Sequence, residues 1–273
     1  MRSRSAGFIV HALLLAAAAV TLCPLAWMVS VSLMSPGEAS TYPPPFLPRQ
    51  ATLASYRELF AHTGMGRNFA NSLLLAVAAT LLSLVFNTTA GYAFAKLRFA
   101  GRERIFKLLL GALVIPAQVA MIPLFLLLES MGLVNSYLGV LIPSIANVFG
   151  IFLVRQYALS FPDELLEAAR IDGAGELRIF RSIVLPALAP ILVTLAIFTF
   201  LGSWNDFLWP LIVLTDEALY PLPVALASLS REHVQDTELM MAGSVLTILP
   251  VLVLFLALQR YYIRGLLAGS IKG

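Results

Sequence analysis

The distribution of charged residues along the chain constrains its fold more than any other feature. Six windows of at least 21 residues contain no Asp, Glu, Lys or Arg: 5–37, 68–95, 108–128, 130–154, 182–205 and 239–259. An α-helix rises about 1.5 Å per residue, so about 20 residues cross the hydrocarbon core of a bilayer. With 59% hydrophobic and 12% charged residues, the chain suits lipid rather than water.

These windows predict an all-α polytopic membrane protein with six transmembrane helices, in one permease-sized domain that covers residues 1–273. A soluble bundle of six buried helices fits the low charge content much less well. The predicted helices cover residues 8–33, 69–94, 106–128, 135–155, 187–210 and 239–259. The longest charge-dense segment, at about 160–185, then forms a loop between the fourth and fifth helices.

The basic residues predict the orientation of the helices. If the N-terminus is inside, the outer segments hold only four Lys or Arg residues, while the other 14 of the 18 lie inside. The four outer residues are Arg49, Arg57, Arg67 and Arg231. Because Lys and Arg are enriched in cytoplasmic loops, both termini and the loop at 160–185 are predicted to be cytoplasmic. The net charge of +3 follows from this bias and does not indicate nucleic-acid binding.

The cytoplasmic loop reads as a helix, a turn and a second helix. Ser160, Pro162 and Asp163 form a typical helix start, with a capping hydroxyl, a first-turn proline and an acid at the positive end of the helix dipole. Gly173 is well placed to end that helix, because glycine adopts the left-handed conformation readily. A second helical segment is predicted at 176–185.

One side of the first loop helix carries small residues. Leu165, Ala168, Ala169 and Asp172 are spaced by three and four, so they are predicted to share a face. Such a face allows another protein to approach closely. The alternative from composition alone is an amphipathic loop that lies on the lipid headgroups, and the two remain open at this level.

Four polar residues inside the predicted spans are candidates for a solute path. They are Asn87, Gln118, Ser144 and Asn147. Hydrogen bonds between helices and the lining of a translocation path both account for them. Asp206 falls near the outer end of the helix predicted at 187–210, where a carboxylate costs little and does not by itself indicate function.

Several chemistries are excluded by the sequence. It contains no Walker-type phosphate-binding loop, so it is not expected to bind ATP itself. No acid or base lies deep within a predicted span, which argues against a proton relay. The three histidines, His11, His62 and His233, are too scattered for a metal site. No catalytic residue and no metal ligand is therefore predicted.

The segment "EAARIDGAGELRIFRSIVLP" resembles the EAA loop of membrane subunits of ATP-binding-cassette (ABC) importers. The Glu-Ala-Ala begins at Glu167, the glycine of the pattern is Gly173, the isoleucine is Ile183, and the Leu-Pro ends at Pro186. Two further stretches, "FLGSWNDFLWPLIVL" at 200–214 and "GLLAGSIKG" at 265–273, resemble the smaller permease of maltose-type carbohydrate importers. The resemblance covers nearly the whole chain.

The resemblance implies a type I ABC importer permease in a bacterial inner membrane. The implied partners are an ABC ATPase dimer that binds ATP and Mg, a second and different permease subunit, and an extracytoplasmic sugar-binding protein, while this chain binds no cofactor. The implied ATPase-coupling residues are Glu167, Ala168, Ala169, Asp172 and Gly173. By the same resemblance, the tail residues Gly269, Ser270 and Lys272 contact the ATPase.

Two other functions remain as alternatives at this level. A passive solute channel or facilitator would need no coupling loop. An integral-membrane enzyme would need clustered His, Asp or Glu at one membrane face. The transported sugar or polyol phosphate is left open, and so is whether this chain contacts it directly.

Overall fold

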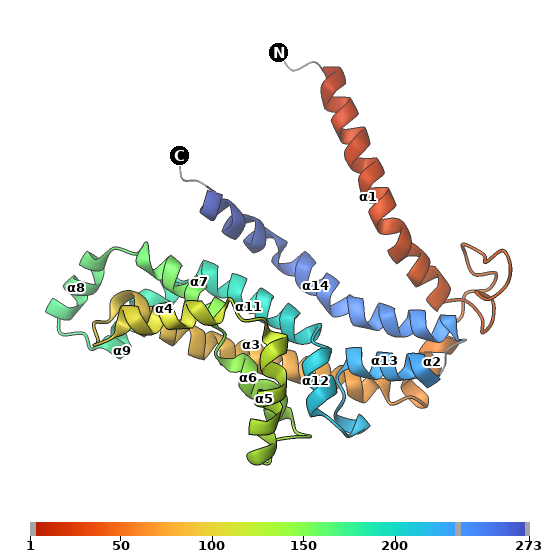
Figure 1. Cartoon of the computed structure of the whole chain (residues 1–273). Coiled ribbons are helices and arrows are strands. Elements are labelled where there is room, and N and C mark those ends of the chain that lie inside the picture. The colour runs from red at the N-terminus through yellow and green to blue at the C-terminus, as the bar shows by residue number, and fades with distance from the viewer. Residues whose placement is uncertain (1–3, 233–235, 271–273) are drawn as a thin grey trace. The chain divides into compact units, whose positions relative to one another are not determined.

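The computed structural model describes residues 4–232 and 236–270, and within these residues the chain is helical with no strand (Figure 1). The α-helices are α1 (Arg4–Ser32), α2 (Ala54–Ala61), α3 (Met65–Lys96), α4 (Arg102–Ala112), α5 (Ala117–Ser130), α6 (Tyr137–Ile145), α7 (Val148–Leu159), α8 (Asp163–Ile171), α9 (Glu176–Ile179), α10 (Leu185–Ala187), α11 (Ala189–Trp204), α12 (Leu208–Val213), α13 (Leu222–Glu232) and α14 (Thr237–Ser270). A π-helical turn, Phe180–Val184, joins α9 to α10, and a 3-10 turn occupies Glu217–Leu219.

Four of the six predicted spans are long apolar segments of the structure. They are Gly7–Ser32, Met65–Lys96, Tyr137–Leu159 and Thr237–Ala257. Each is long and apolar enough to cross a bilayer, which agrees with the first, second, fourth and sixth predicted helices. The polytopic all-helical class predicted from the uncharged windows is therefore confirmed.

The third predicted span is a bent pair of helices and not one continuous helix. It consists of α4 and α5, which are bent by 104° relative to each other. Pro116 is the N-cap of α5 and has an extended ψ of 131°. Because proline lacks an N–H and disfavours a helical residue before it, the first helix ends and the second begins in a new direction.

The fifth predicted span, 187–210, begins at a bend and is interrupted after Trp204. The helical segment Glu176–Ala187 and α11 are bent by 77° at Leu188, between Pro186 and Pro190. The helix predicted at 187–210 ends at Trp204, and a separate short helix, α12, follows after a turn. A polar pair, Asn205 and Asp206, forms that turn.

The chain forms two compact units. One contains Met1–Phe69 and Leu222–Pro250, and the other contains Ala70–Pro221 and Val251–Gly273. In the first unit, the Ser32 hydroxyl lies 2.9 Å from the Tyr56 hydroxyl of α2, and the backbone N–H of Ala39 donates to the Glu238 carboxylate over 2.7 Å. This unit also contains α13, a helix that was not predicted from the sequence.

The second unit contains the loop and the polar span residues discussed below. One apolar cluster joins α3, α7, α8, α9 and α11 through Tyr92, Ala95, Val154, Ala158, Leu166, Ile179, Val184, Leu188 and Leu195. Gly91 permits the close approach of α3 to α7, because a Cβ there would lie 2.7 Å from the Cβ of Val154. The loop helix α8 is thus packed on the transmembrane helices rather than projecting alone.

Candidate functional site

The loop helix α8 begins and ends by different devices. Pro162 is its N-cap, and Asp163 and Glu164 lie in its first turn, where acids favour the positive end of the helix dipole. Ser160 does not cap it, contrary to the prediction, since the Ser160 hydroxyl donates to the Tyr157 carbonyl at the end of α7. The start of α8 therefore depends on proline and charge.

The C-terminal end of α8 is a Schellman motif. Gly173 has a φ of 80°, the left-handed conformation expected from the sequence. The N–H of Gly173 donates to the Arg170 carbonyl, and the N–H of Ala174 donates to the Ala169 carbonyl. These two bonds satisfy the last carbonyls of α8 and turn the chain back toward α9, so the segment is a defined helix–turn–helix.

The predicted coupling residues divide between two faces of α8. Leu166 is buried with 1% of its surface exposed, and Ala169 packs half-buried against the same apolar cluster. Ala168 and Asp172 are exposed, as is Glu167. The face that is free to receive a partner therefore includes Ala168 but not Ala169, because Leu166 determines which side turns inward.

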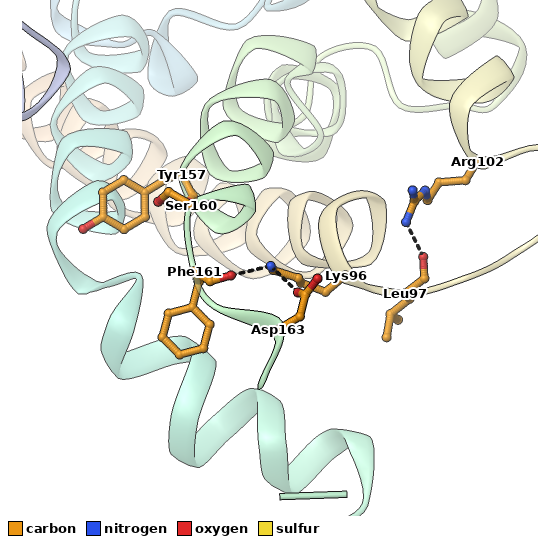
Figure 2. Close-up of polar contacts among 7 residues, drawn as sticks. All are labelled: Lys96, Leu97, Arg102, Tyr157, Ser160, Phe161 and Asp163. Atoms are coloured by element: carbon orange, nitrogen blue, oxygen red, sulfur yellow. Dashed lines mark hydrogen bonds and ion pairs between the residues drawn. The ribbon is translucent and has the colours of Figure 1, made fainter. Parts of the chain in front are cut away.

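Lys96 ties the start of α8 to the end of α3. Its side chain is only 6% exposed, and its ammonium donates to the Phe161 carbonyl over 2.6 Å and to the Asp163 carboxylate over 2.5 Å (Figure 2). Lys96 holds the pKa of Asp163 below its ordinary value, mainly by this hydrogen bond. In the sequence, Lys96 is recognisable only as an inside charge, because nothing local pairs it with residues 65 positions away.

A second polar contact ties the turn after α8 to the same helix. Arg170 donates to Glu176 over 2.7 Å, and the Tyr92 hydroxyl of α3 donates to the other Glu176 oxygen over 3.2 Å. Arg170, acting by its hydrogen bond, lowers the pKa of Glu176. The loop segment is thus held at both ends to α3.

A cavity of about 400 Å³ lies in the second unit, away from the loop. Its wall is formed by parts of α3, α5, α6, α11 and α12 and by the breaks beside them. The polar side chains on that wall are those of Ser144, Asn147, Thr199, Ser203 and Asp206. Small-ligand sites typically enclose about 300–1,000 Å³, so the cavity is large enough for a small solute.

The four predicted path residues do not share one environment. Ser144 and Asn147 lie on the cavity wall. Gln118 is exposed near the start of α5 and is not on the wall. Asn87 is fully buried, donates to the Ser83 hydroxyl over 2.6 Å, and accepts from the backbone N–H of Asn147 over 3.0 Å.

Asp206 lies on the cavity wall. From the sequence, it was predicted only to lie near the outer end of the helix at 187–210. One of its oxygens accepts weakly from the backbone N–H of Trp209, at 3.4 Å, in the first turn of α12. The continuous helix predicted to residue 210 did not indicate that Asp206 lies on the wall of a cavity. The dipeptide Asn205–Asp206 between two tryptophans was the available signal for a break.

The tail residues of the prediction lie at the edge of the described structure. Gly269 and Ser270 are the last two residues of α14, and Lys272 lies outside the described residues. Their contact with an ATPase stays a prediction.

Comparison with known proteins gives consistent findings. The family model described as "Binding-protein-dependent transport system inner membrane component" matches residues 88–267. The chain is 42% identical over 229 residues to the arabinooligosaccharides transport system permease protein AraQ of Halalkalibacterium halodurans, which covers 84% of this chain and 82% of that protein. It is 33% identical over 263 residues to the melibiose/raffinose/stachyose import permease protein MelC of Bacillus subtilis, covering 94% and 95%.

A solved structure is also similar over nearly the whole chain. It is a chain of a bacterial ABC transporter involved in the import of the acidic polysaccharide alginate. The TM-score is 0.85 at 28% sequence identity, and the match covers 96% of this chain and 99% of that one.

Proposed function

The chain belongs to the family of binding-protein-dependent transport system inner membrane components, and from this premise we propose how its parts work. It is the permease subunit of an ABC importer for sugars or oligosaccharides, a non-catalytic multi-pass protein of the bacterial inner membrane. Such a permease works with an ATPase and with a binding protein. The passive channel and the membrane enzyme, which the sequence left open, do not fit this family.

We propose that α8 is the contact through which the ATPase drives this chain. The observation that carries the proposal is an apolar face of α8 that is exposed while the other side of the helix packs against the apolar cluster. Leu165 is 51% exposed and Ile171 is 87% exposed, while Leu166 on the opposite side is buried in the apolar cluster. A partner that covers Leu165 and Ile171 gains apolar burial. Movement of that partner reaches α3 through Lys96 and Glu176.

The same proposal assigns roles to the predicted site residues. Glu167, Ala168 and Asp172 form the exposed contact, Gly173 makes the turn that keeps α8 in place, and Ala169 supports it from the inner side. Gly269, Ser270 and Lys272 reach the ATPase from the C-terminus. ATP and Mg are bound by the ATPase dimer. Both termini and α8 are cytoplasmic, as the distribution of Lys and Arg supports.

The rest of the assembly follows from the same reasoning. The second permease is a different chain, with which this one forms the path through the membrane as a single transmembrane domain spanning residues 1–273. The binding protein delivers an oligosaccharide at the outer face. The names of AraQ and MelC support an oligosaccharide as the cargo, because both relatives cover most of this chain.

The first test is to isolate the chain from native membranes and to identify what accompanies it by mass spectrometry. An ATPase, a second permease and a binding protein are expected. Recovery of this chain alone, under conditions that hold a control importer together, would overturn the proposal.

The second test changes α8 itself. Glu167→Lys and Gly173→Pro should each abolish ATP-driven uptake while the protein still inserts, because neither residue lies in a span. Glu129→Lys is a matched control, since Glu129 is also an exposed acid but lies at the end of α5. Normal uptake by both α8 variants would refute the coupling role.

A further inference from the structure

The polar groups of the cavity come from places where helices are interrupted. Asn147 is the N-cap of α7 at the break after α6, and Asp206 lies in the turn between α11 and α12. Thr199 and Ser203 are four residues apart on α11, so their side chains share the face that leads to Asp206. Irregular backbone at membrane depth is tolerated where it lines a cavity, so these breaks are consistent with a wet, solute-accessible space.

Each of these side chains keeps hydrogen-bonding capacity after its structural contacts are made. The side-chain oxygen of Asn147 accepts from the backbone N–H groups of Phe149 and Gly150, which leaves the side-chain NH₂ as a donor. The second carboxylate oxygen of Asp206 meets no donor among the described residues, and Ser203 makes no side-chain hydrogen bond within them. The wall therefore presents both donors and acceptors to a guest.

The charge and the aromatic residues of the wall indicate which kind of solute the cavity can bind. Among the described residues that line the wall, Asp206 is the one charged residue, and none is Lys, Arg or His. Phe198 is 44% exposed and lines the cavity, where its edge-on contact with Phe149 fixes the ring. A carboxylate, hydroxyls and an amide suit the hydroxyl groups of a sugar, and an aromatic face suits its apolar C–H face.

We propose that this cavity is a subsite on this chain for one neutral saccharide unit, with Asp206 and Asn147 binding its hydroxyl groups and Phe198 packing on its ring. An acidic sugar is disfavoured there, because its carboxylate would face Asp206 with no cation on the wall to compensate. The inference rests on the proposed sugar-importer function and adds two statements to it. This permease touches the solute itself, and it selects against uronates.

The test measures access to the cavity and does not require the cargo to be known beforehand. In the assembled complex, the chain carries Ser203→Cys with its single native cysteine removed by Cys23→Ser. The rate of thiol labelling by a neutral methanethiosulfonate is measured with arabinotriose, raffinose, trigalacturonate or choline at tens of millimolar. Arabinotriose or raffinose should slow labelling at least threefold, whereas trigalacturonate and choline should not.

Two variants make the result specific to Asp206. Adding Asp206→Asn should abolish the protection by neutral sugars, and Asp206→Glu should restore part of it. Ser130→Cys is the control position, because Ser130 is exposed at the end of α5 and does not line the cavity. Labelling there should be the same with every solute.

The outcomes separate this inference from the proposed function. Equal protection by trigalacturonate, protection by choline instead of sugars, or no protection by any solute would each overturn the subsite. Co-isolation of the ATPase and the loss of uptake in Glu167→Lys do not involve Asp206. The proposed function can therefore stand when the subsite fails. Co-isolation of Asp206→Asn with its ATPase, as a single species of the same size as the wild-type complex, shows that the variant is folded.

Discussion

Removing the buried amide of Asn87 should destabilise the protein without altering how it recognises a solute. The Asn87 amide on α3 joins two parts of the second unit, because it accepts from the backbone N–H of Asn147 at the break before α7, and it also donates to Ser83 one turn earlier on α3. Ser83 in turn lies 3.2 Å from the Thr199 hydroxyl of α11. Because the side chain is fully buried and does not line the cavity, we expect it to act through structure.

The magnitude follows from the two hydrogen bonds that Asn87→Ala removes. The bond to Asn147 joins α3 to the start of α7, and such bonds between helices of a membrane protein average about 0.6 kcal/mol. The bond to Ser83 lies within α3 and contributes about 0.5 kcal/mol, the low end for a net hydrogen bond. The backbone N–H of Asn147, at the N-cap, lies outside the α7 hydrogen-bond ladder and loses its acceptor, which costs about 1 kcal/mol at the low end for a part-buried donor. The free energy of unfolding should therefore fall by about 2 kcal/mol.

The assay is reversible unfolding of the purified protein in mild detergent by titration with sodium dodecyl sulfate. Thr89→Ala is the matched control on the same helix, because Thr89 is exposed and its hydroxyl bonds only to carbonyls of its own turns. That variant should stay within about 0.5 kcal/mol of the wild type. If Asn87→Ala is equally neutral and yet changes the KM for uptake, Asn87 belongs to the solute path and the reasoning is refuted.

Three further outcomes are expected from the same structure. Lys96→Ala should reduce ATP-driven uptake more than Asp163→Asn, because Lys96 is buried and also holds a backbone carbonyl, whereas Asp163 is exposed; equal uptake in the two would contradict this. Since the pKa of Asp163 is lowered in the folded protein, its contribution to stability is present above its ordinary pKa and is lost as the pH falls through the folded value. The difference in unfolding free energy between wild type and Asp163→Asn should therefore vanish in acid. Gly91→Ala should destabilise by about 1–3 kcal/mol in the detergent titration, because its Cβ would overlap Val154, and Gly111→Ala, with open space around it, should not.

The spans and the loop could be predicted from the sequence because their signals are local. Excluding charge from about 20 consecutive residues depends only on the bilayer, and it located four continuous spans and the two bent helix pairs. The left-handed Gly173 after α8 follows equally from its own neighbours. The bend of 104° at Pro116 was not predicted, since a proline interrupts a helix without fixing the direction of the next one.

The roles of the polar residues could not be predicted, because they depend on helices far away in the sequence. Asn87 and Asn147 are the same residue type in two predicted spans, yet one is buried behind the cavity and the other lies on its wall. Ala169 shares its helical spacing with Ala168 but faces inward, since Leu166 turns that side toward the apolar cluster. The amphipathic α13 was not predicted, because the acidic residues before and after it within 215–238 are typical of a loop outside the membrane.

The two breaks that the sequence did not locate explain why a chain with so few polar residues can hold a polar cavity. Each break exposes backbone N–H groups of the next helix, and a side chain must satisfy them: Asn147 does so for α7 and Asp206 for the first turn of α12. In both residues one oxygen is used by the helix, and the remaining polar atoms point to no other described partner. A hydrogen bond to the next helix lowers the cost of keeping a polar side chain within an apolar segment, because part of its hydrogen-bonding capacity is already satisfied. The polar atoms of Asn147 and Asp206 that the helices do not use are then available to a solute. The same two residues can therefore serve both helix termination and solute binding.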